Sequence, residues 1–234
     1  AGRYYQGANS IALGNKAGHT GQLGGAIALG DQAGTTNQKA NAIAFGSSAG
    51  NSKQGNAAIA LGDQAGESNQ SGSAIALGQQ AGQSNQGTGS IALGVYAGKI
   101  GQGTGSIAIG EEAGYSGQEN GAVALGLNAG ETTQGSNSIA LGSLAGKYNQ
   151  GANSIVINAS GIALNGSNTG AFYVNPIRNI ESSQVLTYDP STHEITYSDG
   201  PVGPTGPSGP IGPQGNRGYA GDKYATQCND DITL

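Results

Sequence analysis

The chain is built around the stretch Ser106-Ile107-Ala108-Ile109-Gly110-Glu111-Glu112-Ala113-Gly114-Tyr115-Ser116-Gly117-Gln118, one copy of a 16-residue unit that recurs from residue 1 to about residue 161. An apolar anchor returns at every step without insertion or deletion: Ile11, Ile27, Ile43, Ile59, Ile75, Ile91, Ile107, Val123, Ile139 and Ile155. A fixed short period is typical of repeat architectures, in which each unit stacks on its neighbour and none buries a core alone.

The length of the unit indicates the kind of repeat. Sixteen residues are too few for a helix pair but suffice for two short strands and two turns. In the strand Ser106–Ile109, side chains alternate, so Ile107 and Ile109 face one side while Ser106 and Ala108 face the other. We therefore predict an all-β fold, a β-solenoid or β-roll of ten 16-residue coils, with the Ile column and its Leu partners forming the core.

A column of small residues precedes the Ile column. Its members are Ser10, Ala26, Ala42, Ala58, Ala74, Ser90, Ser106, Ala122, Ser138 and Ser154. Since one coil offers only two large apolar side chains, a lone solenoid would be marginally stable. We expect this small face to pack against a neighbouring chain, which predicts an oligomer.

A glutamine column keeps the same step. It comprises Gln6, Gln22, Gln38, Gln54, Gln70, Gln86, Gln102, Gln118, Gln134 and Gln150. Aligned amides would form either a ligand-binding ladder or a structural ladder, in which each Gln bonds turn backbone or the Gln of the next coil. Because the residue recurs in every coil, we favour the structural interpretation, with the ladder running from Gln22 to Gln134.

Composition narrows the class of protein. The 234 residues include 45 Gly and no Met or Trp, and only 10% are charged, with a net charge of −5. The scattered Lys and Arg argue against a nucleic-acid partner, and no apolar run is long enough to insert into a membrane. No catalytic or metal-ligand pattern is present, so we expect neither an enzyme nor a cofactor. Cys228 is the single cysteine, either a free thiol or an interchain bridge.

The chain changes character after the repeat array of residues 1–161. Residues 162–199 predict a small β neck, with strands at 171–174, 185–188 and 194–197 and a Pro-containing hairpin loop between the last two. Glycine then recurs at every third residue across 200–223, with proline following five of these glycines. This is the collagen pattern, which predicts a three-chain stalk and a homotrimer. Residues 224–234 are expected to begin a further segment.

Two resemblances follow from these motifs. The unit Gly105-Ser106-Ile107-Ala108-Ile109-Gly110 resembles the head repeats of trimeric autotransporter adhesins of the YadA type, although that family uses a shorter unit. The neck strands, the collagen triplets and the sequence at 221–226 are similar to fibre proteins of large DNA viruses and tailed phages. The resemblance implies extracellular display, on a virion surface or alternatively on a bacterial cell surface, and attachment to a host.

Sites for a ligand are expected where coils differ, because the fixed columns serve turns and packing. The candidate contact residues are Tyr96, Glu111, Glu112 and Tyr115, which would meet a glycan or protein of the host. Candidate glycosylation acceptors are Asn69, Asn158 and Asn165. We expect a non-enzymatic trimeric fibre acting as an attachment shaft; the alternatives are a structural surface-coat filament or spacer and an ice-binding solenoid.

Overall fold

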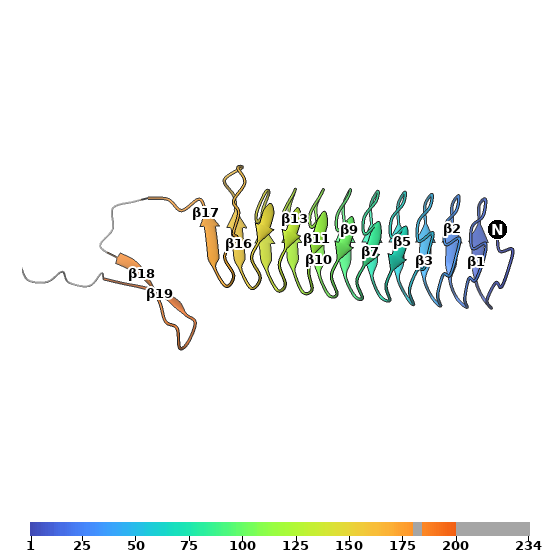
Figure 1. Cartoon of the computed structure of the whole chain (residues 1–234), viewed down its shortest axis with the longest axis horizontal. Helices are drawn as coiled ribbons and strands as arrows, with labels where there is room; N and C mark the ends of the chain where they lie inside the picture. The colour runs from blue at the N-terminus through green and yellow to red at the C-terminus, as the bar shows by residue number, and fades with distance from the viewer. Residues whose placement is uncertain (180–183, 200–234) are drawn as a thin grey trace, which may run out of the picture. The chain divides into compact units, whose positions relative to one another are not determined.

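The computed structural model describes residues 1–179 and 184–199, and it divides the chain after Arg178 into two compact units. The first unit is a parallel β-solenoid of about ten coils stacked along one axis (Figure 1). No helix occurs in the part of the chain that the structure describes. The β-solenoid predicted from the 16-residue period is therefore confirmed.

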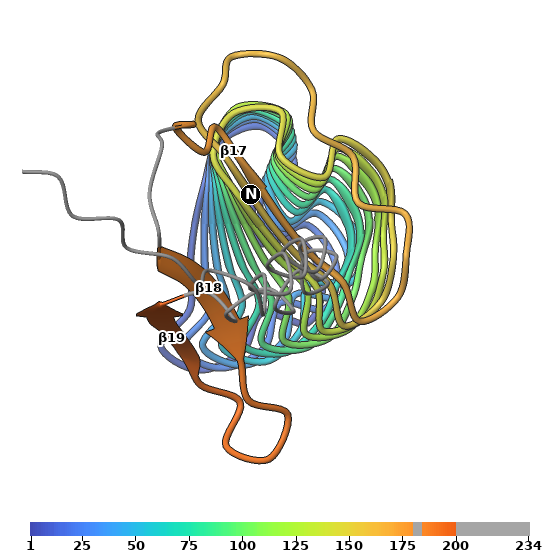
Figure 2. The ribbon, with the colours of Figure 1, turned by 90° about the vertical axis from the view of Figure 1, so that its left-hand side faces the viewer.

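Two parallel sheets run along the solenoid. The first has eleven strands: β1 (Ile11–Leu13), β2 (Ile27–Leu29), β3 (Ile43–Phe45), β4 (Ile59–Leu61), β6 (Ile75–Leu77), β8 (Ile91–Leu93), β10 (Ile107–Ile109), β12 (Val123–Leu125), β14 (Ile139–Leu141), β16 (Ile155–Asn158) and β17 (Phe172–Asn175). The second has six: β5 (Ser68–Gln70), β7 (Ser84–Gln86), β9 (Ile100–Gln102), β11 (Ser116–Gln118), β13 (Thr132–Gln134) and β15 (Tyr148–Gln150). Viewed along its axis, the solenoid shows coils that superpose closely (Figure 2).

The register of both sheets reproduces the sequence period. Ile75 pairs with Ile91 in the first sheet, and Gln70 pairs with Gln86 in the second. Each residue thus lies beside its counterpart one coil away, so a sequence column is a physical row along the solenoid. Isolated parallel bridges extend the second sheet into the first coils. They join, in turn, Tyr4, Thr20, Thr36, Ser52 and Ser68.

Glycines permit the turns at both corners of a coil. Gly78 has φ +128°, and a Cβ placed on it would lie 2.6 Å from the carbonyl oxygen of Gly94. Gly82 has φ +51°, and a Cβ there would lie 2.6 Å from Oε1 of Gln86. Backbone and amide therefore approach these positions too closely for any side chain, and the φ values favour glycine in addition.

The prediction that Ile and Leu fill the interior is wrong. The interior is lined by two alanine columns, exemplified by Ala76 and Ala81, which are fully buried. The side chains of the Ile column lie on the outer face of the first sheet, half-buried in the central coils and exposed at Ile11, Ile139 and Ile155. The Leu residues beside them are more exposed, with Leu77 at 38%. The coil is so narrow that alanine and glutamine fill it, which leaves no room for larger apolar groups.

The expected role of the small column is also corrected. Ala26, Ala74, Ser90 and Ser106 are fully buried inside the coil, as are their counterparts except the half-buried Ser10. Because strand side chains alternate, placing Ala76 inward directs both Ile75 and Leu77 outward and leaves the corner residue Ala74 enclosed. The face available to another chain is thus the Ile and Leu face.

The solenoid continues past the boundary expected at residue 161. β17 pairs in parallel with β16, and Ile155 lies beside Phe172, a step of 17 residues instead of 16. β16 ends at the buried Asn158, whose amide donates to the carbonyl oxygens of Ser143 and Ile162 at 2.8 and 2.7 Å. The strand expected at residues 171–174 in a separate neck is therefore the last strand of the first sheet.

The second unit contains the predicted hairpin. β18 (Gln184–Tyr188) pairs antiparallel with β19 (Ile195–Asp199), as expected from the sequence. Asp189 closes the loop by accepting a hydrogen bond from the backbone N–H of Ser191 at 2.7 Å. These backbone bonds lower the pKa of the Asp189 carboxyl, with the Ser191 bond the larger cause and the Thr192 bond the next. The collagen-like triplets of 200–223, the segment 224–234 and Cys228 lie outside the described residues.

Candidate functional site

The glutamine row is the most regular polar feature of the solenoid. In each coil from Gln22 to Gln150, the buried side-chain amide nitrogen donates to the carbonyl oxygen of the Ile or Val residue 11 positions earlier. Gln70, for example, donates to Ile59 at 2.7 Å, to Ala74 at 3.2 Å and to Oε1 of Gln86 at 3.0 Å. The row is enclosed and its donors are used within the protein, so the structural interpretation of the glutamine column is supported.

The amide ladder is interrupted at defined coils. Gln22, Gln38, Gln54, Gln70 and Gln118 donate to the next glutamine. In each of these coils the small residue four positions later is alanine. In the coils of Gln86, Gln102 and Gln134 that residue is Ser90, Ser106 or Ser138, and no bond joins the next glutamine. Correspondingly, Oε1 of Gln102, Gln118 and Gln150 has no hydrogen-bond partner although buried.

The aromatic candidates for ligand contact lie together. The rings of Tyr96 and Tyr115 meet edge to face, with their centroids 6.5 Å apart. The Lys99 ammonium lies 4.7 Å from the Tyr96 ring centroid and 5.4 Å from that of Tyr115. Lys99 was not among the predicted residues, although the 16-residue column places it directly beside Tyr115. The ammonium group therefore makes cation–π contacts with both rings, which stabilise its charge.

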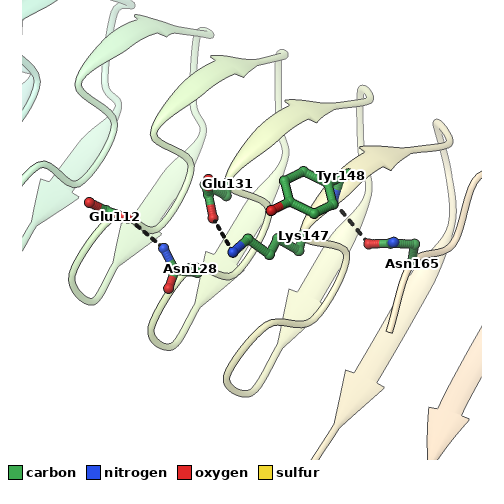
Figure 3. Close-up of polar contacts among 6 residues, drawn as sticks. All are labelled: Glu112, Asn128, Glu131, Lys147, Tyr148 and Asn165. Carbon is green, nitrogen blue, oxygen red and sulfur yellow. Dashed lines mark hydrogen bonds and ion pairs between the residues drawn. The ribbon is translucent and has the colours of Figure 1, made fainter. Parts of the chain in front are cut away.

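The acidic candidates have different surroundings. Glu112 accepts a hydrogen bond from the amide of Asn128, one coil further along, at 2.6 Å (Figure 3). Glu111 is exposed on the neighbouring corner position. The Glu112 carboxylate is thus held by its counterpart in the next coil, Asn128, whereas the Glu111 carboxylate faces solvent.

A charged pair continues the row that contains Tyr115. Lys147 Nζ lies 3.1 Å from a carboxylate oxygen of Glu131, one coil away (Figure 3). The Lys147 ammonium also lies 5.1 Å from the Tyr148 ring centroid. The Tyr148 side chain first, and the Glu131 carboxylate second, raise the pKa of Lys147 above its ordinary value. Both side chains of the pair are half-buried, at 20% and 19% exposure, so the contact links two adjacent coils at the surface.

The glycosylation candidates differ in accessibility. Asn158 is buried, with both amide hydrogens donated to carbonyl oxygens and its Oδ1 accepting from Ser160, so the structure argues against this acceptor. Asn69 is exposed but donates to Oδ1 of Asn85 at 3.1 Å. Asn165 is exposed and accepts from the backbone N–H of Tyr148 at 3.0 Å, and its amide nitrogen has no hydrogen-bond partner among the described residues (Figure 3). Asn165 is therefore the best-placed of the three.

Among the described residues, no group of three or more His, Cys, Asp or Glu side chains is arranged to hold a metal ion. Nor does the described part contain a helix with the length and apolar character needed to cross a bilayer. Comparisons with protein-family models, curated proteins and solved structures gave no significant match.

Proposed function

We propose that the protein is a non-enzymatic trimeric fibre, displayed on a virion surface, whose solenoid serves as an attachment shaft. The observation that carries this proposal is the apolar outer face of the first sheet. Rows of Ile and Leu run along it from β1 to β14, with Leu61, Leu77 and Leu93 between 37% and 38% exposed. A long apolar face on a protein of this kind is typical of an interaction surface.

The interior gives a reason for this face to be covered. Alanine methyl groups and glutamine amides contribute little apolar burial per coil compared with the larger Ile and Leu side chains. Burial of the remaining apolar area is favourable by about 25 cal/mol per Å². Association through this face therefore supplies stability that the isolated coil lacks.

Two further copies of the same chain are the proposed occupants. Glycine at every third residue from Gly200 to Gly221 is the pattern that lets three chains wind about a common axis. Three parallel chains joined through these triplets would have solenoids that run in the same direction, with equivalent coils at the same level. A threefold arrangement then closes on itself, so that each Ile and Leu face is covered and no open contact remains.

Attachment is proposed to use side chains that vary between coils. Tyr96, Tyr115 and Lys99 form one such group, with Glu111 exposed close to it in sequence. Aromatic faces beside a cation and a carboxylate suit a glycan or a protein of the host. Extracellular display is supported by the resemblance of the repeat and of the collagen-like segment to fibre and adhesin proteins.

The test is the oligomeric state of the whole chain, measured by light scattering and native mass spectrometry. Wild-type protein should give three chains. Leu77→Lys with Leu93→Lys places charges on the apolar face and should yield monomers, whereas Leu127→Lys, at a corner that is 47% exposed, should remain trimeric. A wild-type monomer would overturn the proposal, and open-ended assemblies would favour the surface-coat filament instead.

A further inference from the structure

Charge is distributed unevenly along the solenoid. The first sixty residues contain Arg3, Lys16, Lys39 and Lys53 but only one carboxylate, Asp31. Between residues 61 and 146 the balance reverses, with one cation, Lys99, against six carboxylates: Asp63, Glu67, Glu111, Glu112, Glu119 and Glu131. An acidic protein therefore has a basic section near its first four coils.

Lys39 and Lys53 line a common hollow in this basic section. The hollow has a volume of about 410 Å³, and its other lining residues are Asn37, Gln54 and Gly55. Lys53 lies in the same row as Asn37, one coil further along, and Gly55 stands beside Lys39 in the next coil. Because glycine has no side chain, the place beside Lys39 is left open.

The polar groups of the hollow are mostly donors. The exposed ammonium groups of Lys39 and Lys53 have no hydrogen bond, ion pair or ring contact within the described part of the chain. The Gln54 amide is already used, since it donates to Ile43 and Gln70 and accepts from Gln38. The hollow thus offers two free cations and the Asn37 amide, and no carboxylate lines it.

In the later coils, the lysine charges are engaged within the protein. Lys99 lies between two tyrosine rings, and Lys147 is paired with Glu131. Asp31, the carboxylate of the basic section, is engaged by the amide of Asn15 at 2.8 Å. Among these neighbours, Lys39 and Lys53 retain their charge for a ligand.

We infer that the hollow between Lys39 and Lys53 binds the sulfate or carboxylate groups of an acidic polysaccharide. Two ammonium groups from adjacent coils, lining one hollow, suit a ligand with repeated negative charges, and an open hollow accepts a sugar ring with its substituents outside. This inference deepens the proposed attachment function by naming a ligand class, but the binding site itself requires no assumption about assembly.

The experiment measures binding of a heparin-derived hexasaccharide to the whole chain by calorimetry. Lys39→Ser with Lys53→Asn introduces residues that neighbouring coils already carry in those columns, Ser71 and Asn69. This variant should lose at least about tenfold in affinity, as expected when close charge pairs are removed. Lys147→Gln, whose column contains Gln83, is the matched control and should bind within about twofold of wild type because its charge is already paired.

Additional ligands identify the source of the negative charge. Binding of the hexasaccharide should weaken from about 0.05 to about 0.5 M NaCl because salt screens exposed charges. Inorganic sulfate competing equally well per charge would identify a simple anion site and overturn the polysaccharide assignment. Equal losses in both variants, or no binding by wild type, would also overturn it. Light scattering on the same samples reports assembly separately, so a monomer that binds through these lysines would contradict the trimer alone.

Discussion

Gln70 donates a hydrogen bond to Oε1 of Gln86 at 3.0 Å, but Gln86 donates none to Gln102. The two coils differ at the small residue enclosed beside the amide, which is Ala74 in the first and Ser90 in the second. The Ser90 hydroxyl donates to the carbonyl of Gly87 at 2.7 Å. One hydroxyl group thus coincides with a break in the ladder and with a buried, unpartnered amide oxygen on the next glutamine.

Replacing such a serine should repair the ladder. In the variant Ser106→Ala, we expect Gln102 to donate to Oε1 of Gln118 and the midpoint of thermal unfolding to rise. Pairing a buried acceptor outweighs the lost hydroxyl bond to Gly103 by about 1 kcal/mol. Ser154→Ala is the control, because no glutamine follows Gln150 in the row and no gain is expected. A lower midpoint for Ser106→Ala would show that the hydroxyl bond matters more.

Removing a ladder amide should be costly. Gln70→Leu would leave the carbonyls of Ile59 and Ala74 and the amide of Gln54 without their buried partner. We expect a loss of about 3 kcal/mol in the free energy of unfolding, measured by denaturant titration, from these unpaired groups. Gln79→Leu makes the same chemical change at an exposed corner and should change stability by less than about 0.5 kcal/mol. Similar losses in both variants would contradict a structural role for the row.

The corner glycines differ in how much space surrounds them. Gly78→Ala would combine φ +128° with a Cβ only 2.6 Å from the Gly94 carbonyl oxygen. Gly89→Ala has φ +64° but no atom within 4 Å of its Cβ. We expect Gly89→Ala to cost about 1 kcal/mol from backbone strain and Gly78→Ala clearly more, because a coil must also shift. Thermal unfolding followed by circular dichroism compares them, and equal midpoints would contradict the steric argument.

Sequence periodicity was enough to predict the coils because stacked columns impose one register on every unit. The turn glycines and the hairpin of β18 and β19 followed from local rules for left-handed backbone and for Pro-containing loops. Alternation likewise separated Ile75 and Leu77 from Ala76. Alternation alone does not show which of the two sides faces the interior. That depends on how wide the coil is once it closes in three dimensions.

The surface groups were predicted less completely for a related reason. Tyr96, Glu112 and Tyr115 were singled out by residue type, whereas Lys99 completes the aromatic group only through its place beside Tyr115 in the next coil. Lys39 and Lys53 belong to different columns, so no single column brings them together. A row predicts which residues are neighbours one coil apart. Contacts between residues of different rows can be identified only from the three-dimensional structure.

The hairpin loop provides a pH-dependent test. Backbone bonds from Ser191 first and Thr192 second lower the pKa of Asp189 below its ordinary value of 3.8. Because the folded pKa is depressed, the stabilisation of the loop is present above the unfolded pKa and is lost as pH falls through the folded pKa. Carboxyl carbon NMR should show this lowered pKa, and Ser191→Pro, which removes the larger donor, should move it back toward 3.8. An unchanged pKa in that variant would contradict the assigned cause.

The group formed by Tyr96, Lys99 and Tyr115 can be tested separately from the basic hollow. Tyr96→Ser with Tyr115→Ser removes both rings that contact the Lys99 ammonium. If this group binds a host glycan or protein, the variant should lose at least about tenfold in affinity on a glycan array or in a host-cell binding assay, since aromatic anchors dominate such contacts. Tyr5→Ser, at an exposed tyrosine in the first coil, is the matched control and should bind like wild type. Without the two rings, the Lys99 ammonium would be free to bind sulfated sugars nonspecifically, which could hide the loss. A triple variant that adds Lys99→Gln removes this charge as well and so separates the two effects. If both the double and the triple variant bind as well as the Tyr5→Ser control, this group is not part of the attachment surface. That part of the solenoid would then act as a spacer.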